Sequence, residues 1–285
     1  MTVATYAAAQ LLRVLPRTRI TRAVGRLCEA RLSPAVSQAV VGLYARAYAV
    51  ELHEARQNGG YESFDAFFTR RLRDGARPLF DDERAVLSPA DGRVEAIGPV
   101  QAGGTFSIKG RSYRAPELIG DEDDARRYEG GNFAVVYLSP RDYHRVHAPV
   151  AGNVPLVRSL PGDLYPVNSI GERHVPGLFA RNRRVAIVVD TQAHGRVTVV
   201  MVGAMIVGRI TVTGIDERDV PLGNHRFDPP RRVERGDEIG IFHLGSTAVV
   251  FAEPGIGGRW DRPTGPIRMG EALARPSTRN GGGPR

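Results

Sequence analysis

The pattern of apolar residues changes near Pro78, and this change constrains the fold more than any other feature of the 285-residue chain. Beyond Pro78, short runs rich in β-branched residues alternate with turns of Gly, Pro and Asp, a pattern typical of antiparallel sheets. The predicted strands are Arg93–Ile97, Phe133–Tyr137, Asn153–Val157, Val185–Val189, Val197–Val202, Ile206–Val212, Glu238–Phe242 and Thr247–Phe251. We therefore expect an α+β protein in which N-terminal amphipathic helices precede a compact, largely antiparallel β domain.

The region 1–60 is predicted to be helical, interrupted at prolines and ended by a glycine pair. Its apolar residues recur at helical spacing in two stripes: Ile20, Val24 and Leu27, then Val36, Val40, Leu43, Ala47 and Val50. Residues 1–58 also hold eight arginines against three glutamates. Basic amphipathic helices of this kind lie on anionic membrane surfaces. The alternative is a helical layer that packs against the β domain and exposes its arginines to water.

Three regions are expected: a membrane-associating helical region at 1–60, a catalytic β-rich domain at 61–275 and a disordered tail at 276–285. Ser63 is predicted to cap a short helix whose aromatic residues enter the core. The longest uncharged apolar run, Val197–Gly208, has twelve residues. A membrane-spanning helix needs about 20, so this run is predicted to be a buried strand. The N-terminus lacks the basic start and cleavage site of a secretory signal.

The basic residues exclude one common cofactor arrangement. Lys109 is the single lysine among 39 basic residues, and the excess of basic over acidic residues gives a net charge of +8. Pyridoxal enzymes hold their cofactor on a lysine, and arginine cannot replace it because its pKa stays above about 12. The single cysteine, Cys28, also excludes a disulfide framework and a cysteine zinc site.

Three segments carry residues that are suited to catalysis. They are Ser88–Val94 (SPADGRV), Tyr137–Pro149 (YLSPRDYHRVHAP) and Glu238–Phe251 (EIGIFHLGSTAVVF). Each has a simpler explanation when taken alone. Asp91-Gly92 and Gly245-Ser246 are typical of turns. His144 and His147 are three residues apart, but neither a carboxylate nor a cysteine supports them as a metal pair.

Taken in order, these segments resemble the self-processing, pyruvoyl-dependent phosphatidylserine decarboxylases of the shorter bacterial type. The resemblance covers about nine-tenths of the chain, from the N-terminal helices to about Pro254. It rests on PADG, YLSPRDYHRVHAPV, PGDLYPVN, LFARNRRV, VGAMIVG and GDEIGIFHLGST. Two features depart from the pattern: the N-terminal region has no tryptophan, and the acidic run Asp121–Asp124 does not align.

The resemblance implies self-cleavage between Gly245 and Ser246. Asp91, His147 and Ser246 would form the cleaving triad, in which Ser246 attacks, His147 takes its proton and Asp91 orients the imidazole. Ser246 would then become the covalent pyruvoyl cofactor, which forms a Schiff base with the substrate amine. His144 would donate a proton during decarboxylation. The strands on either side of the cut are expected to pair within one sheet, so that the large and small chains stay associated as a heterodimer.

The implied activity is decarboxylation of phosphatidylserine to phosphatidylethanolamine by a peripheral enzyme on the cytoplasmic face of the cell membrane. The implied partners are phosphatidylserine in the bilayer and the anionic membrane surface, without nucleic acid or metal. Three alternatives remain open from the sequence. They are a pyruvoyl decarboxylase of a soluble amino acid, a non-catalytic membrane-surface module, and a metal hydrolase that uses His144 and His147.

Overall fold

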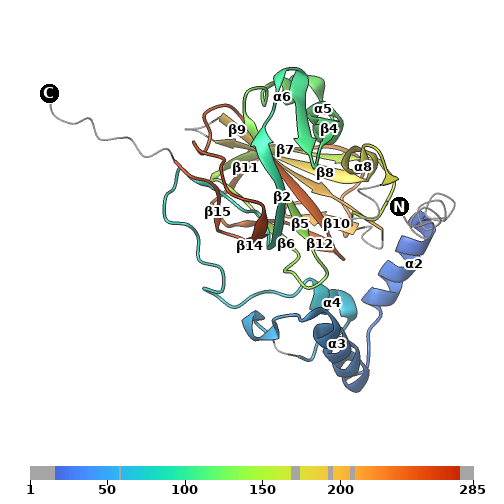
Figure 1. The fold of residues 1–285 in the computed structure, drawn as a ribbon. Coiled ribbons are helices and arrows are strands. Elements are labelled where there is room, and N and C mark those ends of the chain that lie inside the picture. The colour runs from blue at the N-terminus through green and yellow to red at the C-terminus, as the bar shows by residue number, and fades with distance from the viewer. Residues whose placement is uncertain (1–16, 58, 168–173, 192–194, 206–208, 277–285) are drawn as a thin grey trace.

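The computed structural model describes residues 17–57, 59–167, 174–191, 195–205 and 209–276 of the chain. The first part of the predicted helical region and nearly all of the predicted disordered tail lie outside the described residues. Helices gather at the N-terminal end of the chain, and a large β domain follows them (Figure 1). The predicted α+β class and its antiparallel β domain are confirmed.

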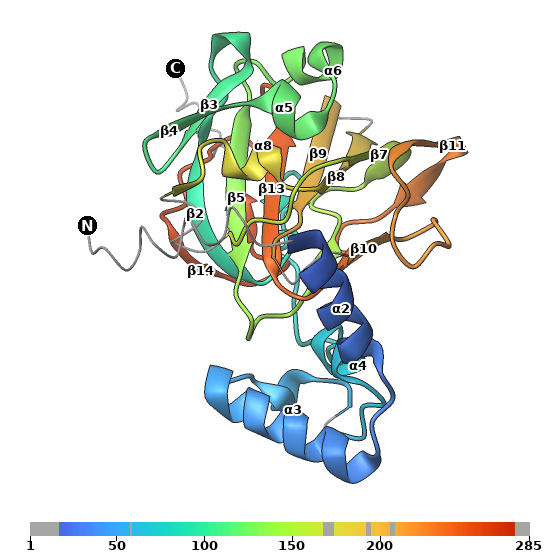
Figure 2. The same ribbon diagram turned by 90° about the vertical axis from the view of Figure 1, so that its right-hand side faces the viewer.

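An eight-stranded antiparallel sheet organises the β domain (Figure 2). Its strands lie in the order β11-β7-β8-β9-β13-β5-β2-β14. Their bounds are β11 Gly223–Val233, β7 Gly152–Leu160, β8 Arg184–Thr191, β9 Gly195–Val202, β13 Ser246–Ala252, β5 Asn132–Leu138, β2 Gly92–Pro99 and β14 Gly265–Ile267. The strand β13 lies between β5 and β9 and pairs with both over most of its length.

Smaller elements complete the domain. A second sheet contains β10 (Arg209–Val212), β12 (Glu238–His243) and β6 (Arg145–His147). Two-stranded pairs join β1 (Val86–Leu87) to β15 (Ala272–Ala274) and β3 (Thr105–Ile108) to β4 (Arg111–Arg114). The short helices are α5 (Ala115–Ile119), α6 (Glu122–Arg126) and α8 (Leu178–Arg181), with 3-10 turns η1 (Leu52–Glu54) and η2 (Ala102–Gly104).

The core is centred on β9 and β13. Every residue from Val197 to Val202 that is apolar is completely buried, as are Ala248 to Ala252. Both faces of these strands are therefore covered, which explains why the sequence shows a continuous apolar run there instead of an alternating one. The acidic run that did not align begins α6: Asp121 caps this helix by accepting a hydrogen bond from the backbone of Asp124.

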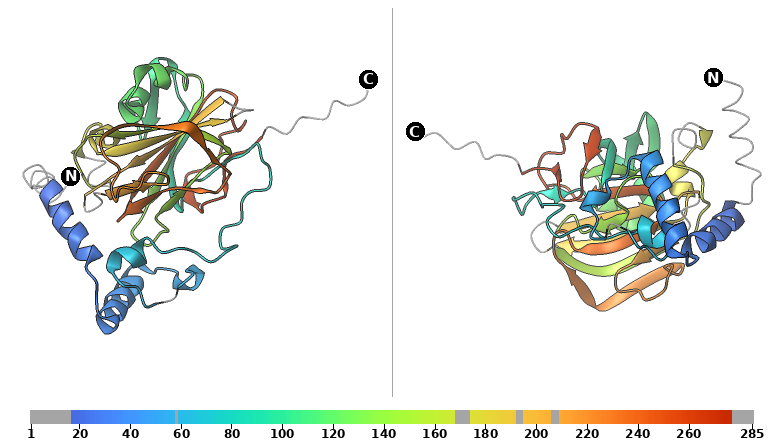
Figure 3. Two further views of the ribbon diagram at one scale, coloured as in Figure 1. Left: turned by 180° about the vertical axis from the view of Figure 1, so that it is seen from behind. Right: turned by 90° about the horizontal axis from the view of Figure 1, so that it is seen from below.

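The N-terminal helices lie at one end of the β domain (Figure 3). They are α2 (Arg17–Glu29), α3 (Pro34–Tyr48) and α4 (Phe64–Phe68). The side chain of Ser63 accepts a hydrogen bond from the backbone of Ala66, so the predicted cap of α4 is confirmed. Phe67 and Phe68 are buried, as expected. Within the described residues, no helix is long and apolar enough to cross a membrane.

The apolar stripe predicted on α3 faces solvent. Val36, Val40 and Leu43 are 48%, 39% and 72% exposed. The residues of α3 that pack inward are instead Ser37, Val41 and Ala45. An exposed apolar stripe on a helix is the arrangement that docking on a membrane would use.

Three local predictions were wrong. The strands β12 and β13 on either side of Gly245 belong to different sheets, because the chain turns sharply between them. The helical region does not run on to the glycine pair, since α3 ends where Ala49 takes a left-handed conformation. The strand β11 was missed because it contains two prolines. It is an edge strand of the large sheet, where proline is tolerated.

Candidate active site

Three strands bring the motif residues together at the end of β5. Leu138 closes β5 and pairs with Ser246, the first residue of β13. On the other side of β5, Gly92 begins β2 so close to Tyr137 that a Cβ would lie 2.1 Å from its carbonyl oxygen. Only glycine permits this approach, which places Asp91 beside the same strand end.

Asp91 is buried and fixed by a bidentate arginine. Its carboxylate accepts hydrogen bonds from Arg77 Nε at 2.9 Å and Arg77 Nη2 at 2.5 Å, and from the backbone amide of Met269 at 2.8 Å. Arg77 also donates to Glu54 at 2.7 Å. Burial by itself would lower the pKa of Arg77, but the bonds to Asp91 and Glu54 outweigh it and raise that pKa. The sequence offered no local signal for Arg77, which lies 14 residues before its partner.

His144 is completely buried next to the Gly245–Ser246 junction. Its Nδ1 donates to the backbone carbonyl of Asp142 at 2.8 Å, and its ring packs on Phe68 with centroids 4.0 Å apart. Its Nε2 has no hydrogen-bond partner and lies 3.7 Å from the position that a Cβ on Gly245 would take. Burial lowers the pKa of His144 to about 3. At neutral pH this imidazole is therefore uncharged, with its Nε2 lone pair directed at the junction.

His147 is also buried, but both of its ring nitrogens are engaged. Nδ1 donates to the carbonyl of Gly236 at 2.7 Å, and the hydroxyl of Tyr143 donates to Nε2 at 3.0 Å. Burial lowers the pKa of His147 and raises that of Tyr143, so the imidazole is neutral and the phenol keeps its proton. The described contacts show no hydrogen bond from His147 to Asp91, although the Asp91 charge acts on the ring electrostatically.

The chain before the junction is strained. Leu244 has a φ of 82°, a left-handed conformation that costs a non-glycine residue about 1–3 kcal/mol. Leu244 is buried, which holds it in place. The strain lies directly before the Gly245–Ser246 peptide.

His243, the last residue of β12, is fixed by charged neighbours. Its Nδ1 is 2.9 Å from Asp65, and Arg209 contacts both residues. Arg209 also pairs with Glu29 of α2. The network links the N-terminal helices to the strand that leads into the junction.

An apolar cavity of ≈ 340 Å³ borders the junction. The N-terminal helices and the β domain share its walls. Its lining residues include Val24, Cys28, Tyr44, Phe64, Phe68, Leu138, Val167, Met205, Leu244 and Gly245. Such a cavity can hold the apolar part of a ligand whose reactive group reaches Ser246.

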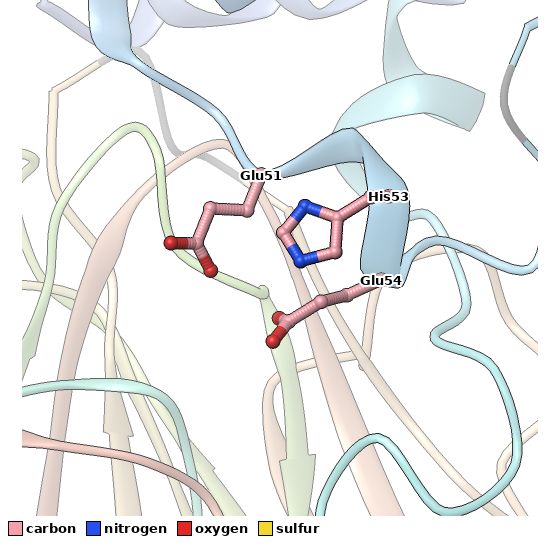
Figure 4. Close-up of side chains that lie close together, drawn as sticks. All are labelled: Glu51, His53 and Glu54. Carbon is pink, nitrogen blue, oxygen red and sulfur yellow. The ribbon is translucent and has the colours of Figure 1, made fainter.

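The structure does not bring His144 and His147 into a metal site. Among the described residues, the one group with metal-ligating spacing is Glu51, His53 and Glu54, which lie close together around η1 (Figure 4). Both carboxylates of this group already pair with Arg268, at 3.2 Å and 2.9 Å. Their charge is thus compensated by arginine.

The fold and the site define an α+β protein in which a neutral, buried histidine faces a strained Leu-Gly-Ser turn. Comparison with known proteins agrees with this class. A family model described as phosphatidylserine decarboxylase matches residues 64–275. The chain is 43% identical to a protein of Bordetella avium over 92% of either chain. It is 42% identical to one of Azotobacter vinelandii, over 93% of this chain and 96% of that one. Both relatives are named phosphatidylserine decarboxylase proenzyme. The chain belongs to the phosphatidylserine decarboxylase family.

Proposed function

We propose that this protein decarboxylates phosphatidylserine to phosphatidylethanolamine, using a pyruvoyl group that it makes from Ser246. Apart from family membership, the observation that carries the proposal is the unpartnered Nε2 of His144 beside the Gly245–Ser246 junction. A buried acceptor without a partner is costly, and such groups mark functional positions. The strained residue immediately before the junction supports the same site.

In the proposed maturation, the Ser246 hydroxyl attacks the Gly245 carbonyl carbon. The peptide nitrogen leaves that carbon, and an ester replaces the amide. Loss of the Ser246 Cα proton then expels the Gly245 carboxylate and leaves a dehydroalanine. Its hydrolysis releases ammonia and yields the pyruvoyl terminus. The strain at Leu244 raises the energy of the intact turn, and cleavage relieves it.

The proposed roles follow the triad. His147 takes the Ser246 proton, and Asp91, held rigid by Arg77, balances the developing imidazolium charge. This role requires Tyr143 to give up its bond to His147 Nε2. One observation favours the reverse assignment, in which His144 is the base: its Nε2 already faces the junction. Variants of the two histidines decide between these assignments.

The site fits a pyruvoyl group at residue 246. A pyruvoyl group there would supply the carbonyl for a Schiff base with the substrate amine and an electron sink for the loss of CO₂. His144 is placed beside this position, where its Nε2 can exchange a proton with the substrate Cα. The surrounding aromatic residues exclude water and lower the local dielectric constant.

We infer that the two chains remain a heterodimer after the cut. The strand β13 would begin the small chain, and it pairs with β5 through seven residues and with β9 through six. Its buried apolar side chains would be exposed if the small chain left. Hydrogen bonds on both edges and burial on both faces hold it in the sheet.

We further propose that the enzyme acts at the cytoplasmic face of the cell membrane. The exposed Val36, Val40 and Leu43 can enter the interface, while neighbouring arginines attract anionic lipid at up to about 1 kcal/mol each. The cavity beside Gly245 is lined by both these helices and the β domain, so a lipid bound at the helices lies near it. A soluble amino acid would have no use for its apolar walls.

The test is conversion of phosphatidylserine in vesicles by the purified protein. The wild type should form phosphatidylethanolamine and CO₂, and Ser246→Ala should form neither. A wild type that decarboxylates free serine but not the lipid would support the soluble-substrate alternative. An inactive wild type that still sediments with anionic vesicles would support the non-catalytic module.

A further inference from the structure

A second cavity, of ≈ 730 Å³, lies on another face of α4. Phe64 and Phe68 line the apolar cavity described above, whereas Ala66, half a turn away, lines this one. Four of its lining residues are arginines: Arg56, Arg70, Arg71 and Arg145. The only carboxylate among its lining residues is Glu62. The walls therefore carry a strong excess of positive charge.

Arg70 is a buried cation without an ionic partner. The residue is 5% exposed, and its guanidinium lies 5.4 Å from the centre of the Phe67 ring. One amino group donates to the carbonyl of Arg141 at 3.1 Å, but Nε has no partner. Among the described residues, no carboxylate lies within ion-pairing distance of Arg70, so only the more distant charges of Asp91 and Asp142 act on it. A buried charge is costly unless an opposite charge compensates it.

Two further arginines face each other at the mouth of the cavity. An antiparallel bridge joins Ala55 to Leu72, and the amide of Arg56 donates to the carbonyl of Arg71 at 2.8 Å. Like charges at facing positions of an antiparallel pair repel each other. Both side chains are exposed, and no described carboxylate pairs with either. Arg145 is different, because it already pairs with Glu238.

We infer that this cavity binds a phosphate group, with Arg70 contacting it from inside and Arg56 and Arg71 at the mouth. Guanidinium groups recognise phosphate through paired, charge-assisted hydrogen bonds. Arg70 also borders a cleft of ≈ 310 Å³ on its other side. Besides Arg70, that cleft is lined by five carboxylates and three arginines, so it lacks the excess of positive charge found in the Arg56 cavity. Phosphate is therefore held on the Arg56 side.

The phosphate can belong to free inorganic phosphate or to an anionic lipid. Ser37 of α3 donates to the carbonyl of Tyr61 in the cavity wall at 2.5 Å, so the cavity adjoins the helix with the exposed apolar stripe. A lipid headgroup at the surface on which α3 docks could therefore enter it. The site is separate from the decarboxylation centre and does not depend on the proposed activity.

The test measures binding of two probes to the full-length protein at constant ionic strength. The probes are inorganic phosphate and water-soluble dihexanoyl phosphatidylglycerol, which is not a substrate of the proposed reaction. The variant Arg56→Gln/Arg71→Gln should bind at least tenfold more weakly than the wild type. Arg226→Gln/Arg232→Gln is the matched control, because it removes the same charge from exposed positions on β11, away from α3 (Figure 2). The control should bind like the wild type.

Binding of both probes assigns the site to the phosphate group itself, and binding of the lipid alone assigns it to a headgroup. Absence of both, or equal losses in variant and control, overturns the inference. Arg70→Met gives a second readout. The probe that binds should raise the melting temperature of the wild type but not that of Arg70→Met. If Arg70→Met does not fold, the comparison of the two double variants decides.

Discussion

Replacing Arg77 with glutamine should destabilise the protein strongly, because it leaves Asp91 buried without a counter-charge and leaves Glu54 with only the half-exposed Arg268. The side chains of Arg77, Asp91 and Glu54 are only 7%, 9% and 13% exposed. Removing one partner of a buried pair costs about 3–5 kcal/mol. With a urea slope of about 3 kcal/mol per M, the midpoint should fall by at least about 1 M. Arg77→Lys keeps the charge but not the bidentate geometry, so its urea midpoint should lie between those of the wild type and Arg77→Gln.

The assay is urea unfolding at pH 7 in a Ser246→Ala background, which keeps the chain in one piece. The matched control is Arg84→Gln, which breaks a pair with Asp82 that is 62% and 32% exposed. Solvent screens this pair, and its loss should not move the midpoint measurably. Equal midpoints for Arg77→Gln and Arg84→Gln would refute the reasoning.

The effect of Arg77→Gln should also depend on pH. Burial raises the pKa of Glu54, but the hydrogen bond and charge of Arg77, with the charge of Arg268, leave it below its usual value. A carboxylate with a lowered pKa stabilises the fold above its unfolded pKa, and that contribution disappears as pH falls through the folded pKa. The difference in unfolding free energy between the wild type and Arg77→Gln should therefore become smaller as the pH falls below about 4.3. A difference in unfolding free energy that becomes larger in acid would contradict the ion-pair explanation.

Three further outcomes are expected. His147→Ala should remain uncut, while His144→Ala should cut but lose about 10²–10⁴-fold in decarboxylation rate. Gel analysis measures the cut and a lipid assay measures the rate. The roles are reversed if His144→Ala stays uncut and His147→Ala cuts. In urea unfolding, Gly92→Ala should lower the free energy of unfolding by about 3 kcal/mol, because its Cβ would lie 2.1 Å from the Tyr137 carbonyl oxygen. Gly98→Ala is the control on the same strand, where the nearest atom is 3.8 Å away, and it should change the free energy of unfolding by less than about 1 kcal/mol. Equal losses in the two variants would contradict this packing argument. Deleting residues 1–31 should leave self-cleavage intact but reduce turnover of bilayer phosphatidylserine and salt-sensitive vesicle binding. Turnover of a short-chain phosphatidylserine should fall much less, although the deletion removes Val24 and Cys28 from the cavity wall. Equal loss on both lipids with unchanged sedimentation would show that the helices only brace the fold.

Periodicity predicted most of the sheet correctly, because the central strands are apolar enough to be recognised without their neighbours. From Val197 to Val202 the strand β9 is one continuous run of buried residues. The edge strand β11 was not predicted, because its prolines and exposed polar residues do not form a continuous apolar run. The direction of the α3 stripe could not be predicted either. Which face of a helix packs inward depends on the surface that it meets, here the wall around Tyr61 and Phe67.

The candidate site was predictable only as a set of motifs. The order of the segments singled out Asp91, His144, His147 and Ser246 as candidates, and the pairing of β5 with β13 and β2 explains why Ser246 and Asp91 lie near the end of β5. Hydrogen-bond partners distant in sequence could not be predicted. Arg77 reaches Asp91 from a separate loop, and Gly236 fixes the tautomer of His147 from 89 residues away.

The most direct test of the central claim is the intact mass of the purified protein. Self-cleavage predicts a large chain that ends at Gly245 and a 40-residue small chain that runs from a pyruvoyl group at position 246 to Arg285. Under native conditions the two should elute together, and under denaturing conditions they should separate. The small chain should resist Edman sequencing because a pyruvoyl terminus has no amino group. A single 285-residue chain with an ordinary serine at position 246 would contradict both the cleavage and the pyruvoyl mechanism.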